Sequence, residues 1–346
     1  MKQFEIRENE SGQRLDKYLK KLMSDAPASF IYKMLRKKNI TLNGNKAAGS
    51  EIIAKGDLVK LFLSDETFDK MAPRKELNFS VKNSVKTDLD VVFEDDNIII
   101  VNKPAGILSQ KAETKDISIN EHIIAYLLET GQFSVDALQT FKPSICNRLD
   151  RNTSGLIMAG KSLKGLQYLS GELKKRSLKK FYRCLVKGVI DKPETMRGYL
   201  LKDERENMVS VFADSGTNRL YIETTYEPIE VIGEYTHLSV HLITGRSHQI
   251  RAHLASIGHP VIGDPKYGDE AVNKLFNKYA DIDRQLLHAY SVELSDGTKF
   301  EAGEPDDFLR AIEYMRTLAG GKGDNTKGNG NMVFKRPSRF NPGGAH

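Results

Sequence analysis

The chain has 346 residues, 39% of them hydrophobic, and a formal net charge of +6. Its length is more than one simple core needs, so it predicts two domains and a tail. The sequence has neither the roughly 20 apolar residues in a row of a membrane-spanning helix nor the apolar stretch of a signal peptide, and Cys146 and Cys184 are too few for a disulfide framework, so we expect a cytoplasmic protein.

Basic charge gathers at the two ends of the chain. Residues 1–64 carry +6 and residues 319–346 carry +4, which leaves −4 for the residues between them. Basic surfaces attract polyanions, usually nucleic acid. Charge alone is equally consistent with an ordinary solvated surface.

Residues 1–64 predict a small domain of two helices and short strands. Apolar residues recur at helical spacing in two segments: Leu15, Tyr18, Leu19 and Leu22, then Ile31, Met34 and Leu35. Strands follow at 40–42 and 58–63, with a tight turn at Asn43-Gly44. The second helix and its end carry a basic edge, which we predict binds RNA through its phosphates. This edge consists of Lys33, Arg36, Lys37 and Lys38.

This N-terminal module resembles the small RNA-binding domain named after ribosomal protein S-four, the alpha-L type. The resemblance rests on RLDKYL at 14–19, KMLR at 33–36, LNG at 42–44 and GD at 56–57. It implies that the module binds folded RNA. An unrelated small domain is the alternative interpretation.

The rest of the chain predicts a linker, a large domain and a tail. Residues 65–87 are polar and contain Pro73, which is typical of a linker. Residues 88–318 mix strands and helices without the regular alternation of a parallel α/β fold. We therefore predict an α+β domain around a largely antiparallel sheet, beginning with a hairpin at 91–101. Residues 319–346 contain seven glycines and few apolar residues, and predict a disordered tail.

The densest polar segment is CNRLDRNTSGLIM at 146–158. Asp150 stands between Arg148 and Arg151, and a Thr-Ser-Gly turn leads on into an apolar strand. A carboxylate beside guanidinium groups stays ionised and can be held in one orientation, which suits a nucleophile or a base. The spacing by itself favours a structural Asp–Arg pair that stabilises the turn.

A second segment, TGRSHQIRAHL at 244–254, predicts the start of a helix after an alternating strand. Its expected buried stripe is Ile250, Leu254 and Ile257. His248 and Arg251 share a polar face, and a helix N-terminus with such side chains suits anionic ligands. In isolation, the histidines are as expected on a hydrogen-bonded helix surface. No Cys or acidic residue stands near them at a metal-ligand spacing, so we predict no metal site.

Two further segments have competing interpretations. KKFYRCLVKG at 179–188 alternates as a strand, with Tyr182, Cys184 and Val186 on one face, and in isolation Tyr182 is typical of a core residue. GLIMAGKS at 155–162 has the spacing of a phosphate-binding P-loop. Its middle positions are apolar, which favours a buried strand over a glycine-rich loop, although a nucleotide-hydrolysing enzyme stays a rival hypothesis.

Taken together and in this order, the segments at 146–158, 179–188 and 244–254 resemble the RluA-type ribosomal large-subunit pseudouridine synthases. The resemblance spans roughly residues 12–317. It implies that Asp150 is the catalytic aspartate, that Tyr182 lies against the target uracil, that Arg246 pairs with the catalytic carboxylate and that Arg148 helps to displace the target base. It also implies that His248, Gln249 and Arg251 bind substrate.

Two positions depart from the resemblance beside the expected pocket. Many members of the family have His where this chain has Asn147, and His-Pro where it has Gln110-Lys111. These differences bear on substrate choice more than on the reaction.

The sequence thus predicts an enzyme that isomerises uridine in structured RNA. Nothing is added or removed in that reaction, so no cofactor or metal is expected, and the partner is RNA. Large-subunit ribosomal RNA is favoured by the resemblance, with transfer RNA as the alternative. Asp150 as nucleophile and Asp150 as base both fit. A non-catalytic RNA-binding protein of the same fold is the other rival.

Overall fold

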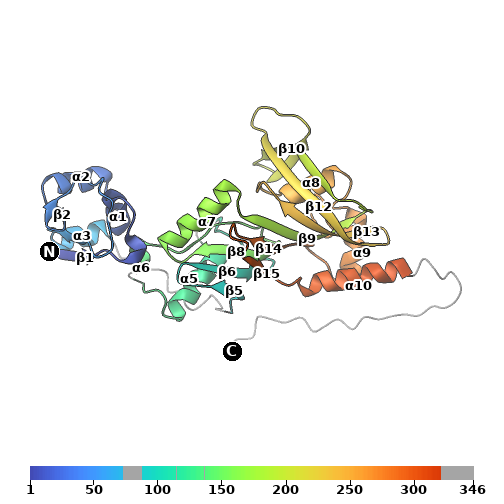
Figure 1. Ribbon diagram of the computed structural model, residues 1–346, viewed down its shortest axis with the longest axis horizontal. Coiled ribbons are helices and arrows are strands. Elements are labelled where there is room, and N and C mark those ends of the chain that lie inside the picture. Colours follow the sequence, from blue (N-terminus) through green and yellow to red (C-terminus); the bar gives the residue numbers. More distant parts are fainter. Residues whose placement is uncertain (73–87, 114, 136, 321–346) are drawn as a thin grey trace.

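The computed structural model describes residues 1–72, 88–113, 115–135 and 137–320. Within these ranges the chain forms two units with separate sheets, a small N-terminal unit at one end and a larger one beside it (Figure 1). The predicted tail, apart from residues 319 and 320, lies outside the described residues. None of the described helices is long and apolar enough to cross a membrane.

The N-terminal unit contains the two predicted helices and the predicted strands, together with further short elements. Its elements are β1 (Lys2–Glu5), the short 3-10 helix η1 (Glu8–Glu10), α1 (Leu15–Leu22), α2 (Ala28–Arg36), β2 (Ile40–Leu42), β3 (Asn45–Lys46), β4 (Leu58–Leu61) and α3 (Asp65–Met71). The strands form an antiparallel sheet in the order β1-β4-β2-β3. The predicted apolar stripes of α1 and α2 are buried in one core. Asn43 and Gly44 have φ of 51° and 78°, as a two-residue hairpin turn requires.

Helix α3 differs from the linker predicted at 65–87. The Ser64 side chain caps it by accepting a hydrogen bond from the Thr67 backbone N–H at 3.2 Å. Phe68 is only 9% exposed and stacks on Phe4, so α3 is part of the N-terminal core. The sequence did not reveal this helix because it is short and Phe68 is a lone buried anchor in a polar segment. Residues 73–87 of the predicted linker lie outside the described part of the chain.

The larger unit is built on an 11-stranded sheet. Its strands are β5 (Val91–Glu94), β6 (Ile98–Lys103), β7 (Ser144–Ile145), β8 (Ser154–Gly160), β9 (Lys179–Lys187), β10 (Glu194–Asp203), β11 (Met208–Phe212), β12 (Leu220–Ile232), β13 (Tyr235–Leu242), β14 (Leu287–Glu293) and β15 (Lys299–Glu301). The main path runs β11-β10-β12-β13-β9-β14-β8-β6-β5, and only the β8–β14 pair is parallel. The predicted α+β class with a largely antiparallel sheet is confirmed.

Helices cover this sheet and connect its strands. They are α5 (Ile119–Glu129), α6 (Ala137–Thr140), α7 (Leu163–Lys175), α8 (Gln249–Ser256), α9 (Glu270–Ala280) and α10 (Asp306–Gly320). The short helix α6 touches α1 of the N-terminal unit, where the Thr140 hydroxyl donates a hydrogen bond to the buried Glu10 carboxylate. The two units are therefore joined by a buried polar contact.

Strand β8 contains most of the segment whose spacing matches a phosphate-binding P-loop. All of its residues are buried, between β6 and β14. Gly155 has φ of 113°, and a Cβ added there would lie 2.3 Å from the Ala289 carbonyl oxygen, so the glycine permits close strand pairing. The segment at 155–162 is a core strand followed by a helix, and the phosphate-loop interpretation is wrong because no backbone amides wrap an open loop there.

Candidate active site

The three chemistry-bearing segments meet at one cavity of about 1050 Å³. The loop before β8 provides Asp150, the start of β9 provides Tyr182, and the turn between β13 and α8 provides Arg246 and His248. These segments are far apart in the chain. They converge because β8, β14, β9 and β13 are neighbours in the sheet.

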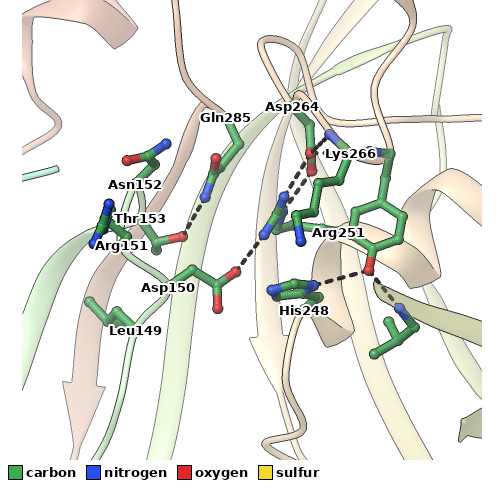
Figure 2. A network of polar contacts seen from close by, with 12 residues as sticks. Leu149, Asp150, Arg151, Asn152, Thr153, His248, Arg251, Asp264, Lys266 and Gln285 are labelled. Carbon is green, nitrogen blue, oxygen red and sulfur yellow. Dashed lines mark hydrogen bonds and ion pairs between the residues drawn. The ribbon is translucent and has the colours of Figure 1, made fainter. Parts of the chain in front are cut away.

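An ion-pair chain of three residues holds Asp150 (Figure 2). Arg251 Nη1 donates to Asp150 Oδ2 at 2.8 Å, while Arg251 Nε and Nη2 donate to the two carboxylate oxygens of Asp264 at 2.6 and 2.7 Å. The other oxygen of Asp150 accepts no hydrogen bond from the described residues. Arg251 therefore uses its planar fork on Asp264 and its remaining nitrogen to orient Asp150.

The central residues of this ion-pair network are buried. The side chains of Arg251 and Asp264 are 4% and 0% exposed, whereas that of Asp150 is 27% exposed at the cavity. Burial by itself lowers the pKa of the Arg251 guanidinium, but the hydrogen bonds and negative charges of Asp264 and Asp150 outweigh it and raise that pKa. The result is a fixed cation that presents one carboxylate to the cavity.

The backbone of the Asp150 loop is bound on both sides of the carboxylate. Ser109 Oγ donates to the Leu149 carbonyl at 2.7 Å and accepts from the Leu149 N–H at 2.9 Å. Lys103 Nζ donates to the Arg151 carbonyl at 3.1 Å, and Arg284 Nη1 donates to the Asn152 carbonyl at 3.1 Å. Lys103 is fully buried, and burial, with the positive charge of Arg284, lowers its pKa to about 7. These contacts fix the loop from which Asp150 projects.

Tyr182 lies on β9 with 6% of its surface exposed and lines the cavity beside Asp150. Burial, together with the negative charge of Asp150, raises the pKa of its hydroxyl, so the phenol is held neutral. Its predicted face is confirmed, since Cys184 and Val186 are buried on the same side.

With this geometry in view, the comparisons with known proteins are specific. Residues 97–256 match the model of the family described as RNA pseudouridylate synthase. Over these residues the chain is similar to this family. Ribosomal large subunit pseudouridine synthase C of Vibrio parahaemolyticus is 28% identical over 90% of this chain and 92% of that protein. Ribosomal large subunit pseudouridine synthase D of Pseudomonas aeruginosa is 27% identical over 88% and 92%.

Solved structures agree on the fold. Human RNA Pseudouridylate Synthase Domain Containing 4 superposes with a TM-score of 0.55 at 17% identity, covering 69% of this chain and 98% of that one. Human RNA Pseudouridylate Synthase Domain Containing 1 gives 0.51 at 21%, covering 66% and 88%. The family match and the curated relatives confirm the enzyme class that the sequence predicts, an RNA pseudouridine synthase.

One predicted contact in this synthase is wrong. The sequence predicts that Arg246 pairs with the Asp150 carboxylate, but its side chain is exposed at the cavity rim and the pairing residue is Arg251. The reason is where α8 begins. His248 is in the left-handed region, with φ of 53°, so the helix begins only at Gln249. Arg246 thus stays in the preceding turn, while Arg251 points inward from the first turn of the helix.

The side chain of Gln249 braces that turn. It is 2% exposed, its oxygen accepts from the Thr244 hydroxyl and the Arg246 N–H, and its amide donates to the Glu223 carbonyl and the Thr224 hydroxyl. With its amide group used in this way, Gln249 fits a positioning role and not the predicted contact with substrate.

His248 faces the cavity from the same turn. Its Nδ1 lies 3.0 Å from the Tyr267 hydroxyl, which also accepts from the Val209 N–H at 2.8 Å. Burial lowers the pKa of His248, and this effect is larger than the opposing effect of the negative charge of Asp150, which raises it. Arg148 is exposed and lines the same cavity. The predicted buried stripe of α8 holds for Ile250 and Leu254 but not for Ile257, which is 40% exposed beyond the helix end.

The cavity is strongly basic. Among the described residues that line it, Asp150 is the only carboxylate, whereas nine are Lys or Arg. The nine are Lys111, Arg148, Arg151, Arg176, Lys180, Lys202, Arg246, Arg251 and Lys266. Sequence reasoning missed Asp264, and it missed Lys180 although this residue stands in the segment at 179–188. No group of His, Cys, Asp or Glu suited to a metal ion occurs in the described ranges.

Proposed function

We propose that this synthase converts uridine to pseudouridine in large-subunit ribosomal RNA, with Asp150 as the catalytic carboxylate. The observation that carries the proposal is the Asp150 carboxylate, the only one among the described residues that line the cavity, which a buried arginine orients and which shares the cavity with nine cations. The cations suit the phosphates of RNA, and the carboxylate suits chemistry at the sugar of one nucleotide. The names of the relatives support ribosomal RNA as the substrate class.

The reaction exchanges one glycosidic bond for another. The bond from uracil N1 to ribose C1′ breaks, the ring turns, and a bond from C5 to C1′ forms; C5 loses a proton and N1 gains one. Asp150 acts at the sugar, as nucleophile or base, through the oxygen that Arg251 leaves unbound. Arg251 stabilises the negative charge and fixes its direction. No electron leaves or enters, so the reaction needs no redox partner.

The target base has to leave its stack to reach Asp150. Tyr182 supports the extruded uracil, because its neutral ring lines the cavity next to the carboxylate. Arg148 and Arg246, both exposed at the rim, contact the RNA around the extruded nucleotide. His248, whose Nδ1 lies beside the Tyr267 hydroxyl, lines the same cavity.

The N-terminal unit, residues 1–72 with α3 included, is proposed as the RNA-binding domain. Lys33, Arg36, Lys37 and Lys38 are all exposed at the end of α2, where they can contact phosphates without disturbing the core. The free cysteines Cys146 and Cys184 are compatible with a reducing compartment, and we place the protein in the cytoplasm.

Mapping of pseudouridine in RNA from cells that lack the protein tests the proposal. We expect one or a few sites to disappear from large-subunit ribosomal RNA, to return with the wild-type protein and to stay absent with Asp150→Asn. Loss confined to transfer RNA would reject the proposed substrate. An unchanged map, together with a purified protein that makes no pseudouridine in unmodified transcripts, would favour a non-catalytic RNA-binding protein.

A further inference from the structure

Lys180 is a cation that lines the cavity. It lies two residues before Tyr182 on β9, and because side chains alternate along a strand, the two share a face and both line the cavity. Its ammonium makes no hydrogen bond or ion pair with the residues that the structure describes. The side chain is half-buried, and burial, with the positive charge of Arg176, lowers the pKa of Lys180.

Two neighbours shape the space around this ammonium. Arg176 ends α7 in a left-handed conformation, with φ of 58°, and lines the same cavity. A Cβ added to Gly245 would lie 3.2 Å from Lys180 Nζ, so the glycine leaves room beside the ammonium. Taking a cation out of water costs free energy unless an opposite charge compensates it. Two cations share the cavity, the charge of Arg176 acts on Lys180, and the only carboxylate among the described lining residues is Asp150, so the arrangement points to an anion that arrives with the substrate.

We propose that Lys180 and Arg176 bind a phosphodiester group of the RNA backbone next to the target uridine and so position the uracil on Tyr182. The inference rests on the proposed function and deepens it. A phosphate suits this place better than a uracil carbonyl, because only an anion satisfies two adjacent cations. Residues i and i+2 of a strand lie about 7 Å apart. This distance leaves room for Lys180 to bind the RNA backbone while Tyr182 contacts the base.

The chain offers a matched control for Lys180. Lys179 is its neighbour on the same strand, faces the opposite side, is exposed and pairs with Glu293 at 2.7 Å. Lys180→Met and Lys179→Met each remove one charge and keep similar length. Both are compared with wild type for tritium release from an unmodified large-subunit ribosomal RNA transcript that contains uridine labelled at C5. Melting curves establish that each variant is folded.

We expect Lys180→Met to lower kcat/KM by about tenfold or more, because the loss of one charge-assisted hydrogen bond has an effect of about that size. Lys179→Met should change kcat/KM by less than threefold. Lys180→Arg should restore most of the activity. Equal effects of the two methionine variants would overturn the inference. A wild-type protein that releases no tritium would instead reject the proposed function, so the two failures can be told apart.

A modified substrate then identifies the phosphate. The probe is a synthetic RNA hairpin centred on the mapped uridine, with a neutral methylphosphonate on its 5′ or its 3′ side. One of the two replacements should lower kcat/KM of the wild type about tenfold but that of Lys180→Met less than twofold, because this variant has no ammonium to bind the phosphate. Arg176→Met, at an exposed position, should show the same non-additivity if Lys180→Met folds poorly. Multiplicative effects in both variants would show that neither residue binds that phosphate.

Discussion

Replacement of Arg251 by lysine tests how this synthase holds Asp150. Arg251 makes three charge-assisted hydrogen bonds, at 2.6 and 2.7 Å to Asp264 and 2.8 Å to Asp150. A lysine keeps the charge but has a single ammonium in place of the planar fork, and cannot bind both carboxylates as the guanidinium does. At least one charged hydrogen bond is removed, and each contributes about 1.5–3 kcal/mol.

The removal is partly compensated. Asp264 also accepts hydrogen bonds from the backbone N–H groups of Lys266 and Tyr267, at 2.9 and 3.2 Å, so its carboxylate is not left bare. We therefore expect Arg251→Lys to lower the free energy of unfolding by about 2–4 kcal/mol. Turnover should fall at least about 100-fold, because a reacting group displaced by about 1 Å loses that much.

Urea denaturation measures the first effect, and tritium release with enzyme in excess over RNA measures the second. Arg246→Lys is the control, since this side chain is exposed and its structural contact is the backbone N–H to Gln249. We expect it to change the free energy of unfolding by less than about 0.5 kcal/mol. An Arg251→Lys variant that turns over within tenfold of wild type, or an Arg246→Lys variant that loses as much free energy of unfolding as Arg251→Lys, would refute the assignment of Arg251 as the orienting residue.

Three further outcomes follow from the structure. Asp150→Asn should abolish pseudouridine formation and change RNA affinity less than about threefold in filter binding, because spread phosphate contacts supply the affinity. Alanine at all four exposed cations of α2 and its end should reduce the slope of log affinity against log salt by up to about 3, at roughly 0.7–0.9 for each phosphate that is no longer neutralised. Burial lowers the pKa of His253 to about 4. The imidazole is neutral in the folded protein and protonates near pH 6.5 in the unfolded chain. Its contribution to the free energy of unfolding, on the order of 2 kcal/mol, is therefore present above pH 6.5 and lost as the pH falls toward 4. In acid denaturation, His253→Gln should not show this loss of stability between about pH 6.5 and 4.

Local pattern is sufficient to predict most elements of the fold. The apolar stripes of α1 and α2, the turn at Asn43 and Gly44, and the alternation around Tyr182 each follow from contacts between near neighbours in the chain. Helix α3 could not be predicted in this way, because a single buried Phe68 gives no period to detect. Its place in the N-terminal core depends on contacts with distant residues, among them Phe4.

The partner of Asp150 could not be read from periodicity. Arg246 and Arg251 stand five residues apart, and which of them points inward depends on the residue where α8 begins. That start is set by the left-handed backbone of His248 and by Gln249, which ties the turn to β12 through Glu223 and Thr224. The pairing itself spans 101 residues of sequence. The family resemblance supplied the right segment, and the packing of the turn supplied the right residue.

The site has two parts: a loop around Asp150 that is held by hydrogen bonds, and a set of cations that have no ion-pair partner in the described structure. Every carbonyl from residue 149 to residue 152 accepts a hydrogen bond within the described structure: from Ser109, the Thr153 N–H, Lys103 and Arg284 in turn. A loop bound at each step leaves the carboxylate little freedom beyond the one direction that Arg251 allows, which is what the proposed action on one sugar, as nucleophile or as base, requires. The rim is built the opposite way. Arg148, Arg246 and Lys180 have no ion-pair partner in the part of the chain described, so their charges are available to phosphates whose positions vary from one RNA fold to another. On the proposed assignment, the tightly bound loop is the part that acts at the sugar, and the cations without an ion-pair partner in the described structure are the part that binds the RNA.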